Sequence, residues 1–142
     1  MTESAVPYQY LVQRCVPHAD RQEFVNVAVV LYVQRLDFLS CASQLDRARL
    51  LALDPGLDLA AVAEGLARVT AICRGDDSAG RAGTVGLGAR FGHLAAPRST
   101  VVQPGPVHGG VLTPALPDPG LVLDHLLTTL VVAPSPGERP TP

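Results

Sequence analysis

The sequence lacks lysine altogether, because all eleven basic residues among its 142 positions are arginines. The absence of lysine excludes Schiff-base chemistry, a P-loop lysine and a lysine general base. Arginine stays protonated, so it binds anions but is a poor group for proton transfer. Tryptophan is also absent, and aromatic residues make up only 4% of the chain. The core must therefore be built from leucine, valine and alanine.

A strong net charge and long apolar runs are missing as well. The net charge of −2 gives no overall attraction for nucleic acid, which argues against a nucleic-acid partner. No apolar run approaches the roughly 20 residues of a membrane span, so we expect no membrane-spanning segment. Cys15, Cys41 and Cys73 are far apart and odd in number, and no secretory signal precedes them. This pattern favours free, buried thiols in a cytoplasmic protein over disulfides or metal ligands.

The first third of the chain predicts three antiparallel strands. Residues 8–16 (YQYLVQRCV) alternate in character, whereas residues 23–33 (EFVNVAVVLYV) are rich in valine and almost continuously apolar. Alternation is typical of a strand with two different faces. A continuous apolar run suits a central strand that is covered on both faces. A third strand is expected over residues 36–42, after a tight turn near Gln34 and Arg35.

Helical spacing follows in the second third and again near the end of the chain. Residues 43–53 predict a first helix. Asp58 is the expected N-cap of a second helix, which ends at Gly75. Asp118, with a proline directly after it, predicts the start of a last helix that runs to about Val131.

These elements predict a single α+β domain over residues 1–132. We expect an antiparallel sheet of three to five strands with helices packed on one face. Residues 76–90 are expected to form a flexible, glycine-rich loop, and residues 133–142 a disordered, proline-rich tail. A short strand is expected over residues 99–102, followed by a turn-rich connection over residues 104–117, a length that is unusual unless it serves a function.

The segment Ala96–Gly110 (APRSTVVQPGPVHGG) is the candidate site. Three prolines and three glycines shape its backbone, and rigid loops of this kind commonly carry binding or catalysis. Its candidate functional side chains are those of Arg98, Ser99, Thr100, Gln103 and His108.

Two interpretations remain open for the first part of this segment. Arg98, Ser99 and Thr100 could converge on an oxyanion or a phosphate. Alternatively, Arg98 caps backbone carbonyls beside Pro97 and the hydroxyls lie along a strand edge.

His108 is the candidate general acid or base, and it is the only histidine within the segment. The four histidines show no HxH or HExxH spacing and the cysteines no CxxC motif, so no metal site is predicted. A nucleophilic pair of Ser99 and His108 lacks a GxSxG elbow and an acid partner. The glycines of residues 83–88 do not form GxGxxG, and no cofactor is predicted.

Arg14, Arg21, Glu23 and Asn26 form a second polar group, around the first hairpin. In a functional interpretation, Arg14 and Asn26 hold an anionic or carbonyl group. In a structural interpretation, Glu23 pairs with an arginine and Asn26 satisfies backbone groups at a bulge, since a polar group buried in an apolar strand must be hydrogen-bonded.

The chain resembles a bacterial family, domain of unknown function 3037. The resemblance rests on YQYLVQRCVPHADRQEFVNVAVVLY (residues 8–32) and APRSTVVQPGPVH (residues 96–108), with LDRARLLALDPGLD (residues 45–58) between them. It extends over roughly residues 6–131 and brings no established activity. It implies a small partner or regulatory protein that is encoded beside a kinase-like protein resembling the HipA toxin family.

Two functions therefore remain in view. In the first, the chain is a binding or accessory protein that grips a peptide or protein partner through the segment Ala96–Gly110. In the second, it is a small enzyme for an anionic substrate, a phosphate or a carboxylate, with Arg98 as the clamp and His108 as the general acid or base. The first is favoured because no complete catalytic set is present, and the oligomeric state is left open.

Overall fold

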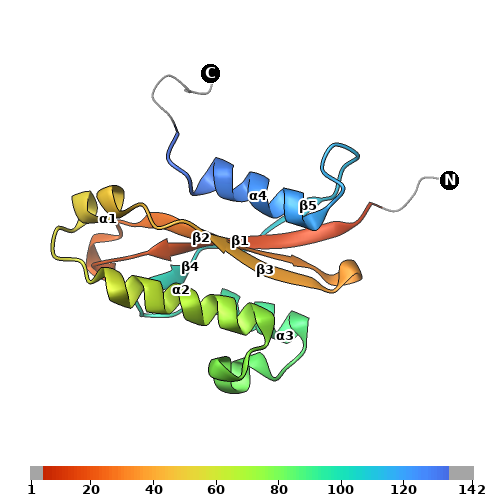
Figure 1. Cartoon of the computed structure of the whole chain (residues 1–142), viewed down its shortest axis with the longest axis horizontal. Coiled ribbons are helices and arrows are strands. Elements are labelled where there is room, and N and C mark those ends of the chain that lie inside the picture. The colour runs from red at the N-terminus through yellow and green to blue at the C-terminus, as the bar shows by residue number, and fades with distance from the viewer. Residues whose placement is uncertain (1–4, 135–142) are drawn as a thin grey trace.

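The computed structural model describes residues 5–134 (Figure 1). Its sheet contains β1 (Pro7–Cys15), β2 (Val25–Val33), β3 (Phe38–Ser43), β4 (Val102–Pro104) and β5 (His108–Val111). β2 lies between β1 and β3, and the other edge of β1 pairs with both β4 and β5. All of these pairings are antiparallel. The predicted antiparallel sheet of a single α+β domain is confirmed, with the five strands at the upper end of the expected range.

β2 is the central strand that its valine-rich sequence predicts. Eight of its nine residues are apolar, and most side chains from Val27 to Val33 are buried on one face or the other. β1 and β2 pair regularly until Gln13, which lies opposite Ala28, and then Arg14 lies opposite Asn26. Val27 is therefore the extra residue of a β-bulge, which increases the local twist of the strand.

Four α-helices lie within the described residues: α1 (Arg47–Leu53), α2 (Leu59–Arg74), α3 (Leu87–Ala95) and α4 (Pro119–Leu130). Asp58 caps α2 by accepting a hydrogen bond from the N–H of Ala61, and Asp118 caps α4 in the same way through Gly120. Gly75 ends α2 with a φ of 70°, a left-handed conformation that glycine adopts without strain. These predicted helix ends are confirmed.

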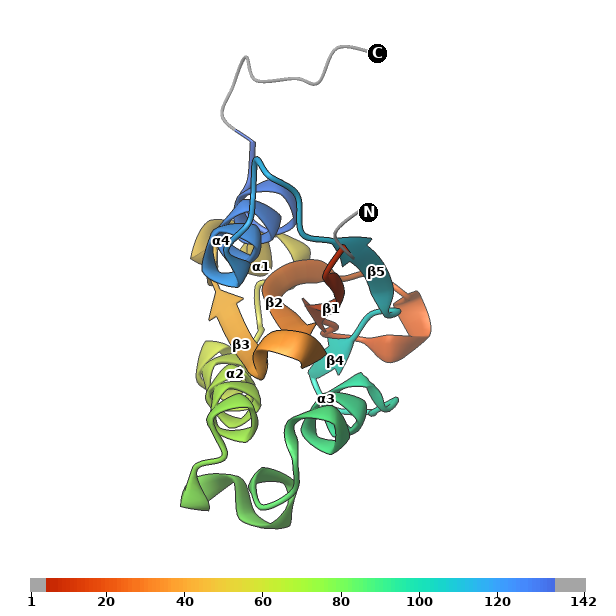
Figure 2. The same cartoon turned by 90° about the vertical axis from the view of Figure 1, so that its right-hand side faces the viewer.

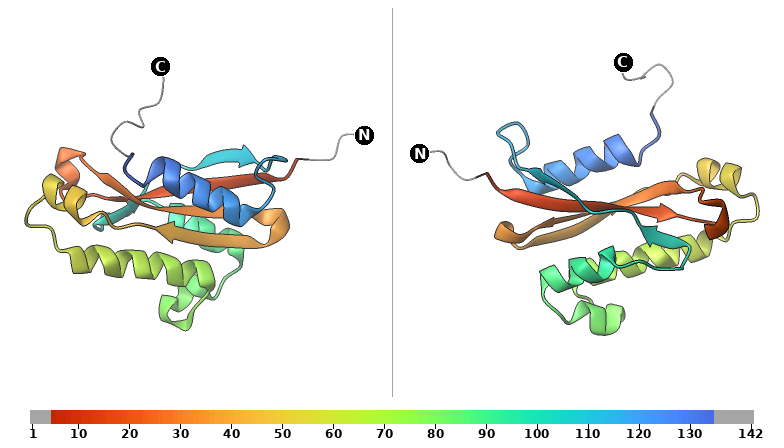
Figure 3. Two further views of the ribbon diagram at one scale, coloured as in Figure 1. Left: turned by 45° about the horizontal axis from the view of Figure 1, so that its top comes forward. Right: turned by 180° about the vertical axis from the view of Figure 1, so that it is seen from behind.

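The helices cover both faces of the sheet rather than one. α2 and α3 pack on the face that carries Leu11 and Val30, while α4 packs on the face that carries Val29 and Leu31. Figures 2 and 3 show α4 on one side of the sheet and α2 and α3 on the other. The expectation of a single covered face was wrong because β2 has two apolar faces, and each needs a helix to exclude water.

The segment expected to be a loop over residues 76–90 contains regular structure. Asp77–Gly83 forms 3₁₀ turns in which Ala79 is buried, and α3 begins at Leu87. The glycine content of this segment predicted a loop, but buried Ala79 and the apolar face of α3 pack against the rest of the protein and order it. α1 begins at Arg47 rather than at Ser43, which belongs to β3, because Asp46 is the N-cap.

The segment after α3 also differs from expectation. The predicted strand over residues 99–102 is displaced to β4, and the predicted turn-rich connection contains β5. Of the predicted tail over residues 133–142, only residues 133 and 134 lie inside the described part of the chain.

Candidate functional site

The segment Ala96–Gly110 includes β4 and most of β5, and both strands pair with one edge of β1. Its side chains contribute to both faces of the sheet. Arg98 and Thr100 line a cavity with α2 and α3, whereas His108 stacks on Tyr10 with ring centroids 5.3 Å apart. Gln13 of β1 lines that same cavity, and Tyr10 belongs to the cluster of side chains packed near α4. Because side chains alternate along a strand, Gln13 and Tyr10 lie on opposite faces. The structure therefore does not bring Arg98 and His108 together.

The cavity beside Arg98 has a volume of about 430 Å³ and lies between α2, α3 and residues 98–102. Its walls are mostly apolar, and they include Val69, Ile72, Leu94, Val101 and Val102. Gly65 of α2 lets Val102 approach closely, since a Cβ at this position would lie 2.7 Å from Cγ2 of Val102. The volume falls within the usual range of small-molecule sites, and an apolar wall with few polar groups is typical of them.

Two arginines lie at this cavity, Arg98 and Arg68 of α2. Arg98 donates a hydrogen bond from Nη2 to the carbonyl oxygen of His93 at 2.8 Å, so its guanidinium is held at the end of α3. The ion pairs found within residues 5–134 are Arg21 with Glu23 and His18 with Asp54. Neither cavity arginine therefore has a carboxylate partner in the described part of the chain.

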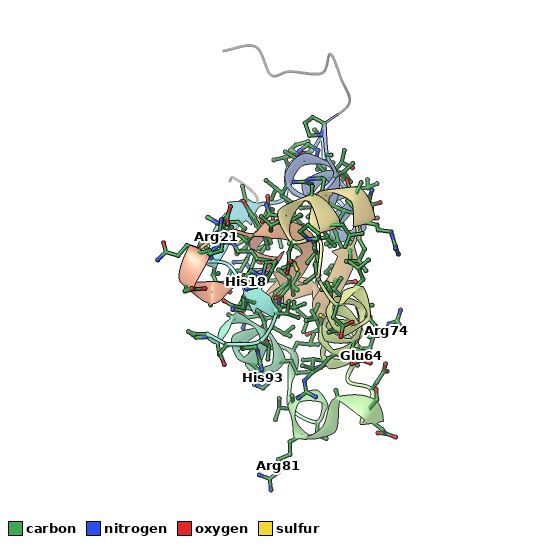
Figure 4. All side chains as sticks on the ribbon, turned by 90° about the vertical axis from the view of Figure 1, so that its left-hand side faces the viewer. His18, Arg21, Glu64, Arg74, Arg81 and His93 are labelled. Carbon is green, nitrogen blue, oxygen red and sulfur yellow. The ribbon has the colours of Figure 1, made fainter. Side chains whose placement is uncertain are left out.

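The positive charges of these two arginines affect the pKa of His93. Its pKa is lowered, first by burial and then by the charges of Arg98 and Arg68. Its Nε2 atom is buried without a hydrogen-bond partner among the described residues. Figure 4 shows His93 on α3 and Glu64 on α2, and Glu64 is the one acidic residue that lines the cavity.

Gln13 is the buried polar residue that lines the cavity. It is only 2% exposed, and it is the one polar residue among the buried residues of the described chain. A buried amide needs partners for both its N–H groups and its oxygen. Its position in the cavity makes it available to a bound molecule that carries a donor and an acceptor.

The hydroxyl groups of Thr100 and Ser99 differ in their surroundings. The hydroxyl of Thr100 donates to the carbonyl oxygen of Val102 at 2.8 Å, which shapes the entry into β4. Ser99 is exposed. Together with the bond from Arg98 to a helix carbonyl, these placements fit the structural interpretation of residues 98–100, although Arg98 and Thr100 line the cavity at the same time.

Arg14 and Gln103 lie opposite each other in β1 and β4 and share a second cavity, of about 310 Å³. The guanidinium carbon of Arg14 lies 4.1 Å from the ring centre of Phe24. Its Nε atom is buried and has no hydrogen-bond partner within residues 5–134.

Glu23 and Asn26 make part of the contacts of the structural interpretation, since Oδ1 of Asn26 is buried without a hydrogen-bond partner among the described residues. Glu23 pairs with Arg21, and Asn26 at the bulge donates from Nδ2 to the carbonyl oxygen of Leu130 at 3.0 Å. Asn26 thus ties the end of α4 to the central strand. Figure 4 shows Arg21 beside the turn after β1, away from Glu64 and His93.

Sequence reasoning missed the cavity residues Gln13, Glu64 and Arg68. Glu64 and Arg68 are one helical turn apart on α2, a spacing that is also typical of an ordinary solvated face. Gln13 stands in a strand whose predicted faces are both mixed. These residues could not be identified from the sequence, because α3 and residues 98–102 come together with them only in the folded chain.

Burial makes the three thiols weaker acids, and residues 5–134 contain no cluster of metal ligands. Burial raises the pKa of Cys41 to about 11 and that of Cys73 to about 12, and it also raises the pKa of Cys15. Across residues 5–134, no three His, Cys, Asp or Glu side chains gather closely enough to hold a metal ion. No helix in the same range has the length and hydrophobicity to cross a membrane.

Comparison with protein-family models gives a match over most of the chain. The family model described as Protein of unknown function (DUF3037) matches residues 10–131. The chain belongs to this family. The DUF3037 match covers the whole sheet from Tyr10 onward and all four α-helices, and so includes both cavities. No curated protein and no solved structure matches the chain.

Proposed function

We propose that this DUF3037 protein is a binding or accessory protein that holds the carboxyl-terminal end of a peptide or protein partner. The observation that carries the proposal is the pair of guanidinium groups, Arg68 and Arg98, beside an apolar cavity of about 430 Å³. Neither has a carboxylate partner within residues 5–134. A ligand with an apolar body and one carboxylate complements this arrangement.

Arginine geometry favours the carboxylate. The planar guanidinium presents parallel N–H groups that match the two oxygens of a carboxylate. Arg98 uses one Nη2 hydrogen bond to hold the carbonyl of His93, which orients the group and leaves other N–H groups for a ligand. A side chain that is already fixed loses less conformational entropy on binding.

The rest of the cavity suits a peptide. Val69, Ile72 and Leu94 provide an apolar surface for side chains, and burial of apolar area stabilises the complex by about 25 cal/mol per Å² before the costs of association. The amide of Gln13, which lines the cavity, can donate to and accept from a peptide group. The kinase-like partner implied by the family resemblance would thus enter with its carboxyl terminus.

The enzymatic alternative has less support from the geometry. It requires Arg98 and His108 to act on one substrate, but these residues serve opposite faces of the sheet. Proton transfer requires a side chain within hydrogen-bond reach of the reacting group, directly or through one water. His108 is exposed on β5 and does not line the cavity that Arg98 lines.

The test uses N-acetyl-leucyl-leucine with a free carboxylate and the same dipeptide as its carboxamide, each titrated calorimetrically into the full-length protein. The acid should bind roughly tenfold or more tightly than the amide, a difference of at least about 1.4 kcal/mol. Arg98→Gln should remove this preference, and His108→Ala should leave it unchanged. Equal affinities for the two dipeptides, or no binding of either, would overturn the proposal.

A further inference from the structure

A second cavity lies at the junction of β1, β4 and the turn before β2. It is on the opposite face of the sheet from the cavity lined by Arg68 and Arg98, which is called the peptide cavity below. The second cavity encloses about 310 Å³, and Arg14 and Gln103 contribute its polar groups together with Gln22. Arg14 and Gln103 are register partners and so project from the same face. Nothing in the peptide-binding proposal uses this cavity.

The guanidinium of Arg14 is fixed by its surroundings. Phe24 covers it, with the guanidinium carbon 4.1 Å from the ring centre. Gly105 lies so close that a Cβ there would be 3.0–3.2 Å from Nε, Cζ and Nη2. The N–H of Gly105 is itself bonded to the carbonyl oxygen of Val12 at 2.8 Å, which anchors the glycine to β1. Arg14 thus lies between the ring of Phe24 and the anchored backbone of Gly105.

The charge of Arg14 is not balanced locally. Asp20 and Glu23 are the acidic residues that follow Arg14 most closely in the sequence. Glu23 is paired with Arg21, and no carboxylate within residues 5–134 pairs with Arg14. Its Nε atom is buried without a partner. A half-buried cation without a counter-charge costs free energy, and a carboxylate that supplies two acceptor oxygens offsets this cost.

The turn beside the cavity has an unusual backbone. Gln22 has a φ of 57°, a left-handed conformation that non-glycine residues adopt at a cost. It follows the short 3₁₀ turn Ala19–Arg21, whose residue Ala19 also lines the cavity. This conformation places Gln22 at the cavity that contains Arg14 and Gln103. Two amides and one guanidinium therefore surround the same space.

We infer that this cavity is a carboxylate-binding site in which Arg14 is the recognition group and Gln22 and Gln103 donate supporting hydrogen bonds. The ring of Phe24 and the backbone of Gly105 cover the flat surface of the guanidinium, which favours approach along its N–H edge. A planar carboxylate suits that edge, as an acidic side chain of a partner would present it. The two cavities share no lining residue, so a negative result for one binding proposal does not overturn the other.

The side-chain Nε–H signal of Arg14 provides a direct test in ¹⁵N-labelled protein. We expect glutarate, which carries the carboxylate of a glutamate side chain, to shift this signal in a saturable manner at constant ionic strength. Arg14→Lys identifies the signal and retains the positive charge, but it should weaken glutarate binding roughly tenfold because the planar N–H edge is lost. Arg81→Lys is the matched control, because Arg81 projects outward from the 3₁₀ segment (Figure 4) and should leave binding unchanged.

Three outcomes would overturn the inference. One is an Arg14 signal that glutarate does not shift. Another is a signal that responds only to inorganic phosphate, which would make the ligand tetrahedral rather than planar. The third is an equal affinity of glutarate for Arg14→Lys and the wild type. If Arg14→Lys does not fold, Phe24→Leu, which removes the stacked ring at an exposed position, should weaken glutarate binding instead.

Discussion

Gln13 and Arg14 follow each other in β1 and line cavities on opposite faces of the sheet. In β4, Val102 lines the first cavity, and Gln103, which is the register partner of Arg14, lines the second. One short pair of strands therefore shapes both sites. A slip of one residue in this pairing would exchange the faces and destroy both cavities at once.

Gly65→Ala should destabilise the protein, whereas Gly92→Ala should stabilise it. A Cβ at Gly65 would meet Cγ2 of Val102 at 2.7 Å, while a Cβ at Gly92 of α3 would meet nothing within 4 Å. Overpacking costs about 1–3 kcal/mol, which exceeds the gain of about 0.5–1 kcal/mol from replacing a helical glycine by alanine. Urea unfolding measures both changes. A Gly65→Ala protein as stable as Gly92→Ala would contradict the close approach of α2 to β4.

Arg98→Gln should raise the pKa of His93. Burial lowers this pKa first, and the charges of Arg98 and Arg68 lower it further, so removal of one charge restores part of the shift. Because the folded pKa lies below the ordinary value of 6.5, His93 destabilises the fold as the pH falls below 6.5, and the variant should reduce this loss. An NMR pH titration of the His93 ring measures the pKa. Arg81→Gln should leave it unchanged, and an unmoved pKa in Arg98→Gln would show that the Arg98 charge does not reach the ring.

Alkaline pH should weaken the fold through its buried thiols. Burial raises the pKa of Cys41 from 9.0 to about 11 and that of Cys73 from 9.0 to about 12. The stabilisation from keeping these thiols neutral is complete below pH 9.0 and is lost as the pH rises through the folded pKa values.

Urea unfolding at about pH 8 and about pH 10 tests this dependence. The decrease in stability should be smaller in a Cys41→Ala, Cys73→Ala double variant than in the wild type. Comparing the two pH values within each protein removes the constant cost of the smaller side chains. An equal decrease in both proteins would assign the pH dependence to other groups.

The sequence predicted the parts of the fold that depend on local chemistry. Asp58, Gly75 and Asp118 determine helix ends through hydrogen bonds and backbone conformations within a few residues. The apolar run of β2 likewise identified a buried strand without further information. Such features depend on neighbours along the chain and are therefore readable from it.

The candidate site depends on long-range pairing, which the sequence did not reveal. Arg98 and His108 are close in sequence, but β4 and β5 pair with different parts of β1, and this separates the two residues between the faces of the sheet. No alternating pattern in the proline-rich segment specifies that register. Arg68 joined the site only because α2 packs beside residues 98–102.

The pairing of β1 with β4 and β5 also affects how the chain folds. β1, β2 and β3 can assemble as soon as they are synthesised, because each pairs with the next along the chain. The second edge of β1 stays unpaired until residues 102–111 emerge, after α2 and α3. Contacts of such long sequence separation form late and slow the folding rate. A nascent or truncated chain that ends before Val102 therefore exposes a free strand edge, the template on which β-proteins aggregate.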